Sequence, residues 1–217
     1  MNSGPSKRRL CILSGLSGVL GVVLLVTSFA INSAPPPGIS SPELIKFGHE
    51  HYAAVLWGAW LQAVGPVLIV ILALALVHLA DATQQLAGWM TLFGASVLMT
   101  VSLIEITFYI SALNADPALM PPVSLNVIFA VQHLFFVVAA PSLFLPLGFV
   151  LLRSPVLPRV FAYLALAIGI IFALLGVVFL LRLRLPDAIT ALGGVQALWW
   201  LAAGIALIAR ARKLSTV

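Results

Sequence analysis

The sequence has one cysteine, Cys11, and few charged residues, since only 8% of its 217 positions are Asp, Glu, Lys or Arg. A single cysteine excludes a disulfide within the chain. Soluble domains carry about a quarter charged residues, so the low share excludes an ordinary soluble domain. A phosphate-binding glycine loop with a lysine, a Cys–His metal set and an arginine-rich sensor helix are also lacking. The basic residues are scattered, so no nucleic-acid partner is expected.

The chain is instead rich in apolar residues, which make up 62% of it, and its mean hydropathy is +1.18. A bilayer is spanned by about 20 apolar residues in helical form. The short segments of alternating polarity that are typical of a membrane β-barrel are lacking. We therefore expect a single integral membrane domain over residues 1–217, an all-α bundle of six transmembrane helices. The expected spans are residues 10–31, 53–80, 87–113, 125–152, 160–181 and 188–209.

Lysine and arginine predict the orientation, because cytoplasmic loops carry an excess of both. With a cytoplasmic N-terminus, eight basic residues lie inside and three outside. The inside set is Lys7, Arg8, Arg9, Arg153, Arg159, Arg210, Arg212 and Lys213, and the outside set is Lys46, Arg182 and Arg184. Both termini are thus expected to be cytoplasmic, in a bacterial inner membrane. The first span also resembles a signal peptide with a cleavage site at Ser28–Ala30, but its apolar run is long, which favours a retained helix.

Four expected spans each contain one polar side chain at a similar depth: Gln62, Glu105, His133 and Gln196. Counting about 1.5 Å per residue from the outer helix ends places all four about 12–14 Å below the outer surface. A carboxylate in hydrocarbon is costly and normally marks a functional site. The alternative is a purely structural hydrogen-bond network, in which each bond contributes only about 0.6 kcal/mol.

The neighbours of these four residues are small or polar on one helix side, so we expect all four to face the bundle interior. Glu105 is then within hydrogen-bond reach of His133 or of one glutamine. We also expect a cavity at this level that takes the polar end of an amphipathic molecule. The other candidate ligand-binding residues are Tyr109, Asn126, Trp60, Trp199 and Trp200, with Trp57 nearby. An interfacial aromatic belt is the alternative interpretation of the tryptophans.

Three functions remain open. The first is binding or transport of a small amphipathic molecule or of protons at the polar layer. The second is an enzyme acting on a lipid or isoprenoid, with Glu105 and His133 as candidate acid and base. The third is an accessory subunit without a ligand. Rows of small residues, Ser14, Gly18 and Gly21 in the first span and Ala165, Gly169 and Ala173 in the fifth, serve either internal packing or an oligomer interface.

Metals and cofactors have little support, and none is expected. His49 and His51 are weak metal candidates beside Glu50 at the outer end of the second span, but residues two apart on a helix point in different directions. They follow a short surface helix expected over residues 43–47. A single buried histidine is too little to assign haem ligation. The expected spans contain no lysine, which excludes a retinal Schiff base.

Three short motifs carry a family resemblance. They are the run Ser102-Leu-Ile-Glu105, the stretch from Ala140 to Pro146 with Pro141 near its start, and Leu157-Pro158-Arg159. Together they are similar to families of six-helix bacterial membrane proteins of unknown function. The resemblance covers most of the chain and implies the fold, but it implies no activity and no residue roles. Membrane lipids and the amphipathic ligand are the expected partners.

Overall fold

The computed structural model describes residues 4–32, 41–114, 130–131, 133–180 and 186–213. These residues are helical apart from short turns, and no strand occurs among them. The helices are α1 (Gly4–Ile31), α2 (Ser41–Glu50), α3 (Tyr52–Leu79), α4 (Leu86–Asn114), the π-helix η1 (Phe135–Ala139), α6 (Ala140–Leu152), α7 (Arg159–Leu180) and α8 (Pro186–Lys213). The short surface helix expected over residues 43–47 is longer than predicted and forms α2.

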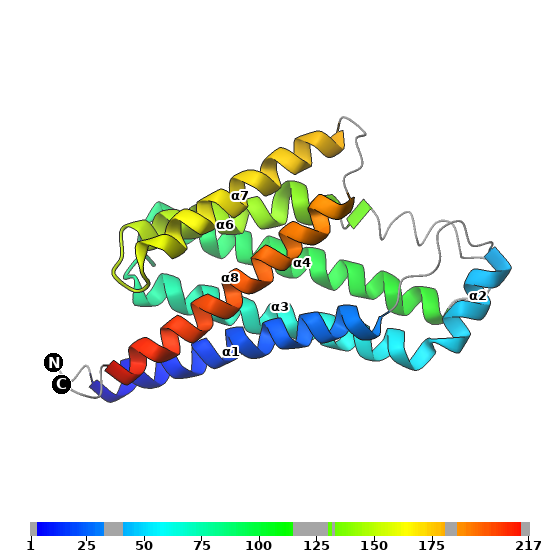
Figure 1. Ribbon diagram of the computed structural model, residues 1–217, viewed down its shortest axis with the longest axis horizontal. Helices are drawn as coiled ribbons and strands as arrows, with labels where there is room; N and C mark the ends of the chain where they lie inside the picture. The colour runs from blue at the N-terminus through cyan, green and yellow to red at the C-terminus, as the bar shows by residue number, and fades with distance from the viewer. Residues whose placement is uncertain (1–3, 33–40, 115–129, 132, 181–185, 214–217) are drawn as a thin grey trace.

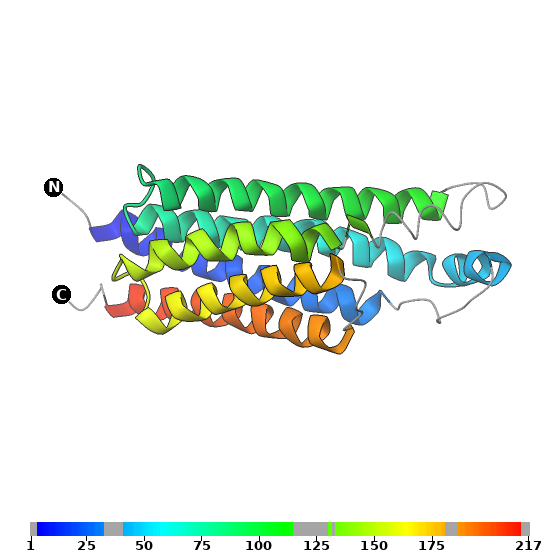
Figure 2. The ribbon, with the colours of Figure 1, turned by 90° about the horizontal axis from the view of Figure 1, so that it is seen from above.

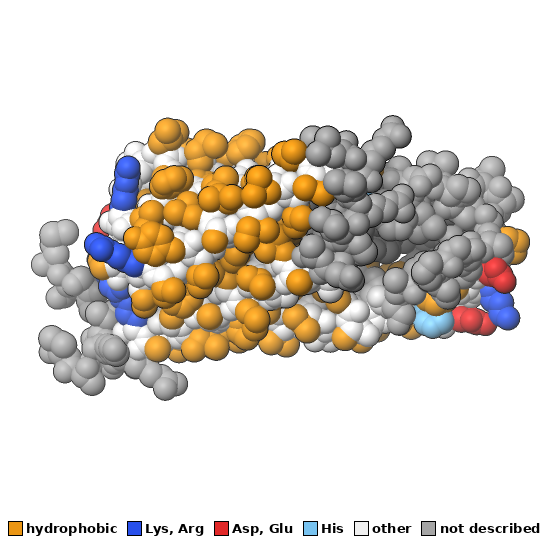
Figure 3. Space-filling view, turned by 45° about the horizontal axis from the view of Figure 1, so that its top comes forward, with side chains coloured by type: hydrophobic (Ala, Val, Ile, Leu, Met, Phe, Trp, Pro, Cys, Tyr) orange, Lys and Arg blue, Asp and Glu red, His pale blue; other side chains and the backbone are white. Residues whose placement is uncertain are grey.

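Five helical segments are long and apolar enough to cross a membrane: Lys7–Ile31, Tyr52–Leu79, Leu86–Phe108, Arg159–Val178 and Thr190–Ala211. The expected span 125–152 is described only from residue 130, and its apolar helix Val137–Leu152 is shorter than these five. Large apolar side chains also cover the outside of the bundle (Figure 3), among them Phe29 at 69% and Leu174 at 60% exposure. Helices that are apolar on their outward faces belong in lipid. These features indicate an integral membrane protein and confirm the all-α class.

The helices pack against one another in an order that runs around the bundle (Figures 1 and 2). α1 packs between α3 and α8, α4 packs against α3 and α6, and α7 packs against α6 and α8. α1 begins and α8 ends at the same end of the bundle, while α2 lies at the opposite end, beyond α3. Both termini of the helical bundle therefore lie on one side.

Glycines bring α1 into backbone contact with both of its neighbours. A Cβ atom on Gly15 would lie 2.6 Å from the carbonyl oxygen of Gly204 in α8, and one on Gly204 would lie 2.8 Å from that of Gly15. Gly21 and Gly65 of α3 form a similar reciprocal contact at 2.7 and 3.0 Å. The small-residue face predicted for the first span thus serves packing within the chain, as is common for helices in lipid.

A proline closely follows the π-helix that precedes α6. Pro141 has no N–H, so the carbonyl of Val137 loses its α-helical donor. In the preceding turn, the N–H of Ala140 bonds the carbonyl of Phe135, five residues back. Gly176 of α7 packs on this turn, where its Cβ would lie 3.0 Å from the Cα of Val137. The extra residue in the π turn rotates the preceding residues by about 100° relative to α6.

Candidate functional site

Gln62 lies inside the bundle, in the first half of α3, where this helix meets α1. Its side chain is 6% exposed and shares the buried face of α3 with Gly58, Pro66 and Ile69. Pro66 has no N–H and therefore leaves the backbone carbonyl of Gln62, four residues earlier, without its helical donor. Gln62 thus presents both an amide and a freed carbonyl group in the core.

Ser28 joins this polar group and was missed by the sequence analysis. Its side chain is 0% exposed, and its hydroxyl donates a 2.8 Å hydrogen bond to the carbonyl oxygen of Gly58. A signal for it was present, because Ser28 follows Gly21 by seven residues, about two turns, and so lies on the same face of α1. That face contacts α3 through Gly21, which places the Ser28 hydroxyl between the two helices.

Gln196, on α8, is half-buried. Its buried neighbours on that helix are Leu192, Trp199, Trp200 and Ala203, which lie one turn before or up to two turns after it. The Oε1 atom of Gln196 is buried and has no hydrogen-bond partner in the described part of the chain. An unpaired buried acceptor costs about 1–3 kcal/mol and calls for an explanation. It is the clearest sign of an unsatisfied polar site in the bundle.

Trp199 and Trp200 form an aromatic cluster beside Gln196. They are 4% and 1% exposed and contact each other edge to face, with ring centroids 4.7 Å apart. Phe144 of α6 lies 5.4 Å from Trp199 and 5.3 Å from Trp200. The indole N–H of Trp199 donates to the carbonyl oxygen of Phe161 in α7 at 3.0 Å. Both tryptophans are therefore packed core residues that join α6, α7 and α8, and their role in ligand binding stays a prediction.

Trp57 and Trp60 lie on the outer surface instead. They are 62% and 53% exposed, with ring centroids 6.1 Å apart. Trp89 and Tyr163, near the opposite helix ends, are 58% and 60% exposed. Trp57 precedes the last residue of α3 by 22 positions, about 33 Å along the helix, close to the thickness of a hydrocarbon core. This spacing favours two interfacial aromatic belts over a cavity wall for Trp57 and Trp60.

Helical periodicity places Glu105 on the face of α4 that packs against α6 and η1. On α4, Gly94 contacts the carbonyl group of Ser142 in α6 so closely that a Cβ atom would overlap it. Glu105 follows Gly94 by eleven residues, so it lies within about 20° of the same face. Eleven residues before Ser142 is Val131, which places Glu105 level with Val131 and His133 in the antiparallel neighbour. The side chain of Glu105 is half-buried there.

His133 differs from the inward-facing position expected for it, because its side chain is exposed. In an unbroken α-helix, His133 would share the face of Phe144, eleven residues later, and Phe144 is 1% exposed in the core. The π turn of η1 lies between the two residues and rotates His133 by about 100° away from that face. The imidazole therefore lies at the rim of the polar layer.

Four candidate residues remain. Asn126 and the side chain of Tyr109 lie outside the described residues. The other two, His49 and His51, gain no support as metal ligands. The ring of His51 stacks on Phe47 with centroids 4.2 Å apart, and Glu50 pairs with Lys46 at 3.8 Å. In the described ranges, no three His, Cys, Asp or Glu side chains are close enough to hold a metal ion. His49 and His51 therefore remain weak metal candidates.

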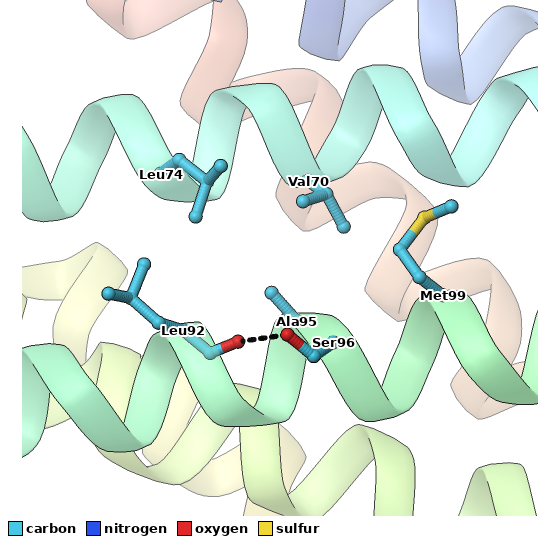
Figure 4. Close-up of a pocket in the computed structure, with 6 residues that line it drawn as sticks. All are labelled: Val70, Leu74, Leu92, Ala95, Ser96 and Met99. Carbon is cyan, nitrogen blue, oxygen red and sulfur yellow. Dashed lines mark hydrogen bonds between the residues drawn. The ribbon is translucent and has the colours of Figure 1, made fainter.

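A separate apolar groove lies between α3 and α4 (Figure 4). Its volume is about 360 Å³, and it is lined by Val70, Leu74, Leu92, Ala95, Ser96 and Met99. The hydroxyl of Ser96 donates to the carbonyl oxygen of Leu92 at 3.1 Å, so the groove offers no free polar group from this side chain. Met99 lies about 120° around α4 from Glu105. The groove is therefore distinct from the polar layer.

Comparison of the sequence with protein-family models found no match, and neither did the comparisons with curated proteins and with solved structures. Two glutamines present amide groups in the core, and a carboxylate and an imidazole lie toward the rim. Such a set accepts hydrogen bonds from a hydroxyl or ammonium group.

Proposed function

We propose that the protein binds a small amphipathic molecule, through a hydroxyl or ammonium group, in the layer formed by Gln62, Glu105, His133 and Gln196. The observation that carries this proposal is the buried Oε1 atom of Gln196, which has no donor in the described part of the chain. A ligand donor would remove the cost of about 1–3 kcal/mol that such an atom imposes. The freed carbonyl of Gln62 adds a second acceptor in the core.

The rim of the layer supports entry from the lipid side. His133 is exposed and Glu105 half-buried, at one level between α4 and the segment before η1. A molecule dissolved in the outer leaflet would meet these groups first and keep its apolar part in hydrocarbon. A carboxylate at the entrance favours a donor-bearing or cationic polar group over an anion. In this proposal both termini are cytoplasmic, so the layer lies in the outer half of the bilayer.

The test compares organic molecules that copurify with the wild-type chain and with Gln196→Leu. We expect a molecule with a hydroxyl or amine group in the wild type, identified by mass spectrometry of solvent extracts, and its loss from the variant. The variant should fold with equal or greater stability, because the substitution removes an unpaired buried oxygen. Gln85→Leu, at an exposed position between α3 and α4, is the matched control. Equal recovery from wild type and Gln196→Leu would contradict the proposal.

A further inference from the structure

The end of the bundle where α1 begins and α8 ends is strongly basic (Figure 3). Among the described residues with exposed side chains, five cations lie at this end: Lys7, Arg8, Arg9, Arg153 and Arg159. Asp81, between α3 and α4, is the acid that the described residues place there. The Lys46–Glu50 ion pair is in α2, which lies at the opposite end (Figure 1). Among the described residues, the five cations at this end thus outnumber the one acidic residue, Asp81, that lies there.

Arg153 and Arg159 lie on either side of a short loop whose backbone is firmly held. Val156 and Leu157 in this loop are 5% and 4% exposed, so they anchor it in the core. The backbone N–H of Val156 donates to the hydroxyl oxygen of Ser154 at 3.1 Å. The guanidinium of Arg210, from α8, donates to the carbonyl oxygen of Pro155. Fixing the loop lowers the entropic cost of holding a ligand between the two arginines.

Each of these two arginines has an exposed aromatic side chain one helical turn away toward the bilayer. Phe149 precedes Arg153 by four residues at the end of α6 and is 51% exposed. Tyr163 follows Arg159 by four residues at the start of α7 and is 60% exposed. Side chains four residues apart lie on the same helix face. Two pairs of one arginine and one aromatic ring therefore stand on neighbouring antiparallel helices.

The contacts between α6 and α7 put the two pairs on the same side. A Cβ atom on Gly148 would lie 2.6 Å from Leu166, and one on Gly169 would lie 2.8 Å from Leu145, which defines the facing sides of the two helices. At about 100° per residue, Phe149 lies about 70° from the facing side of α6, and Arg159 and Tyr163 lie about 50° and about 90° from the facing side of α7, in the same rotational sense along each chain. Because the helices are antiparallel, these rotations point to one common outward side.

We propose that Arg153 and Arg159 bind the phosphate of an anionic phospholipid in the leaflet at the basic end, with Phe149 and Tyr163 against its glycerol and upper acyl chains. Guanidinium groups match phosphate oxygens with paired hydrogen bonds. Aromatic rings are favoured at the depth of the headgroups. Free phosphate would also bind the guanidinium groups, but it has no apolar part to contact the aromatic rings. The pairing of each arginine with an exposed aromatic ring therefore indicates a lipid. This inference is independent of the polar layer.

Native mass spectrometry of the delipidated full chain, titrated with phosphatidylglycerol or phosphatidylcholine, tests the proposal. We expect tighter binding of phosphatidylglycerol, and the double variant Arg153→Gln/Arg159→Gln should weaken it about thirtyfold, at about fivefold for each basic residue. Binding of phosphatidylcholine should stay nearly unchanged in that variant. Tyr163→Ala should weaken the binding of both lipids, because it removes an apolar contact that both lipids make.

The control is Arg8→Gln/Arg9→Gln, which removes the same charge at the same end but on α1, which packs against α3 and α8. It should change phosphatidylglycerol binding much less than the Arg153/Arg159 pair. An equal loss in both double variants would show a diffuse charge effect and overturn the proposal. Unchanged binding in Arg153→Gln/Arg159→Gln would overturn it too, as would displacement of the lipid by excess inorganic phosphate. Circular dichroism of each variant checks that these exposed substitutions leave the fold intact.

Discussion

At the scale of single residues, the glycines of α8 differ sharply in what surrounds them, and this gives a direct stability test. A Cβ atom on Gly204 would meet the backbone of α1, whereas one on Gly194 would meet nothing within 4 Å. We expect Gly204→Ala to destabilise the protein by about 1–3 kcal/mol through overpacking. Gly194→Ala should be neutral or stabilising by up to about 1 kcal/mol, because alanine favours the helix. Unfolding in detergent measures both, and equal effects would show that the α1–α8 contact is not tight.

The carboxylate of Glu105 allows a second test at the residue scale, because glutamine keeps its shape and most of its hydrogen bonds. Under the proposed function, Glu105→Gln weakens binding of the copurifying molecule while the folded yield stays roughly at the wild-type level. Thr107→Val, two residues away, removes a hydroxyl that donates to the carbonyl oxygen of Leu103 within α4 and serves as the control. Mass spectrometry of the bound molecule and size-exclusion yield are the two measurements. Wild-type binding by Glu105→Gln would favour a purely structural network.

At the scale of helices, most boundaries follow from the sequence because the bilayer itself sets them. The span expected over 53–80 is Tyr52–Leu79 in the structure, and the one expected over 87–113 is Leu86–Asn114. The inward faces of Gln62 and Gln196 followed from their small and polar neighbours. The exposed face of Trp60 did not, because α3 is apolar on every side and its pattern does not distinguish core from lipid.

The π turn of η1 could not be predicted from sequence patterns. Pro141 indicates a disturbed turn, but a kink, a π turn and a lost hydrogen bond are all compatible with proline in a membrane helix. Packing of Gly176 on Val137 accompanies the π turn, and that contact is between residues far apart in the chain. The face of His133 depends on this choice, so its exposed position differs from the inward face that the sequence predicts.

Deleting Val138, an exposed residue of η1, should convert the π turn into a regular α-helical turn. His133 would then rotate by about 100° toward the face of Phe144 in the core. A nitroxide label at position 133, in a Cys11→Ala background, should lose collisions with oxygen dissolved in the lipid after the deletion. A label at Val160, exposed on α7, should be unaffected. Unchanged collision rates at position 133 would show that η1 does not set the direction of this side chain.

At the scale of the whole molecule, two independent features set its expected place in the membrane. Trp57 is exposed about 33 Å before the end of α3, which is close to the thickness of a bilayer core, and Trp89 and Tyr163 are exposed near the opposite helix ends. Basic residues gather at the end where α1 begins and α8 ends (Figure 3). The aromatic residues predict how deep the bundle sits, and the basic residues predict which end is cytoplasmic.

We expect both ends of the chain to lie in the cytoplasm. Figures 1 and 2 place the start of α1 and the end of α8 on one side, so both should give the same reporter signal. A fluorescent reporter fused after Val217 should be bright, because it folds in the cytoplasm, and alkaline phosphatase fused there should be inactive. The same two reporters inserted near Asp116, outside the described residues, should give the opposite result, since α4 leads to the other side of the bundle. Replacing Arg153 and Arg159 by glutamine should leave this orientation unchanged, because six of the eight basic residues expected inside remain. An active phosphatase after Val217 would reverse the orientation and would place the polar layer in the cytoplasmic half of the bilayer.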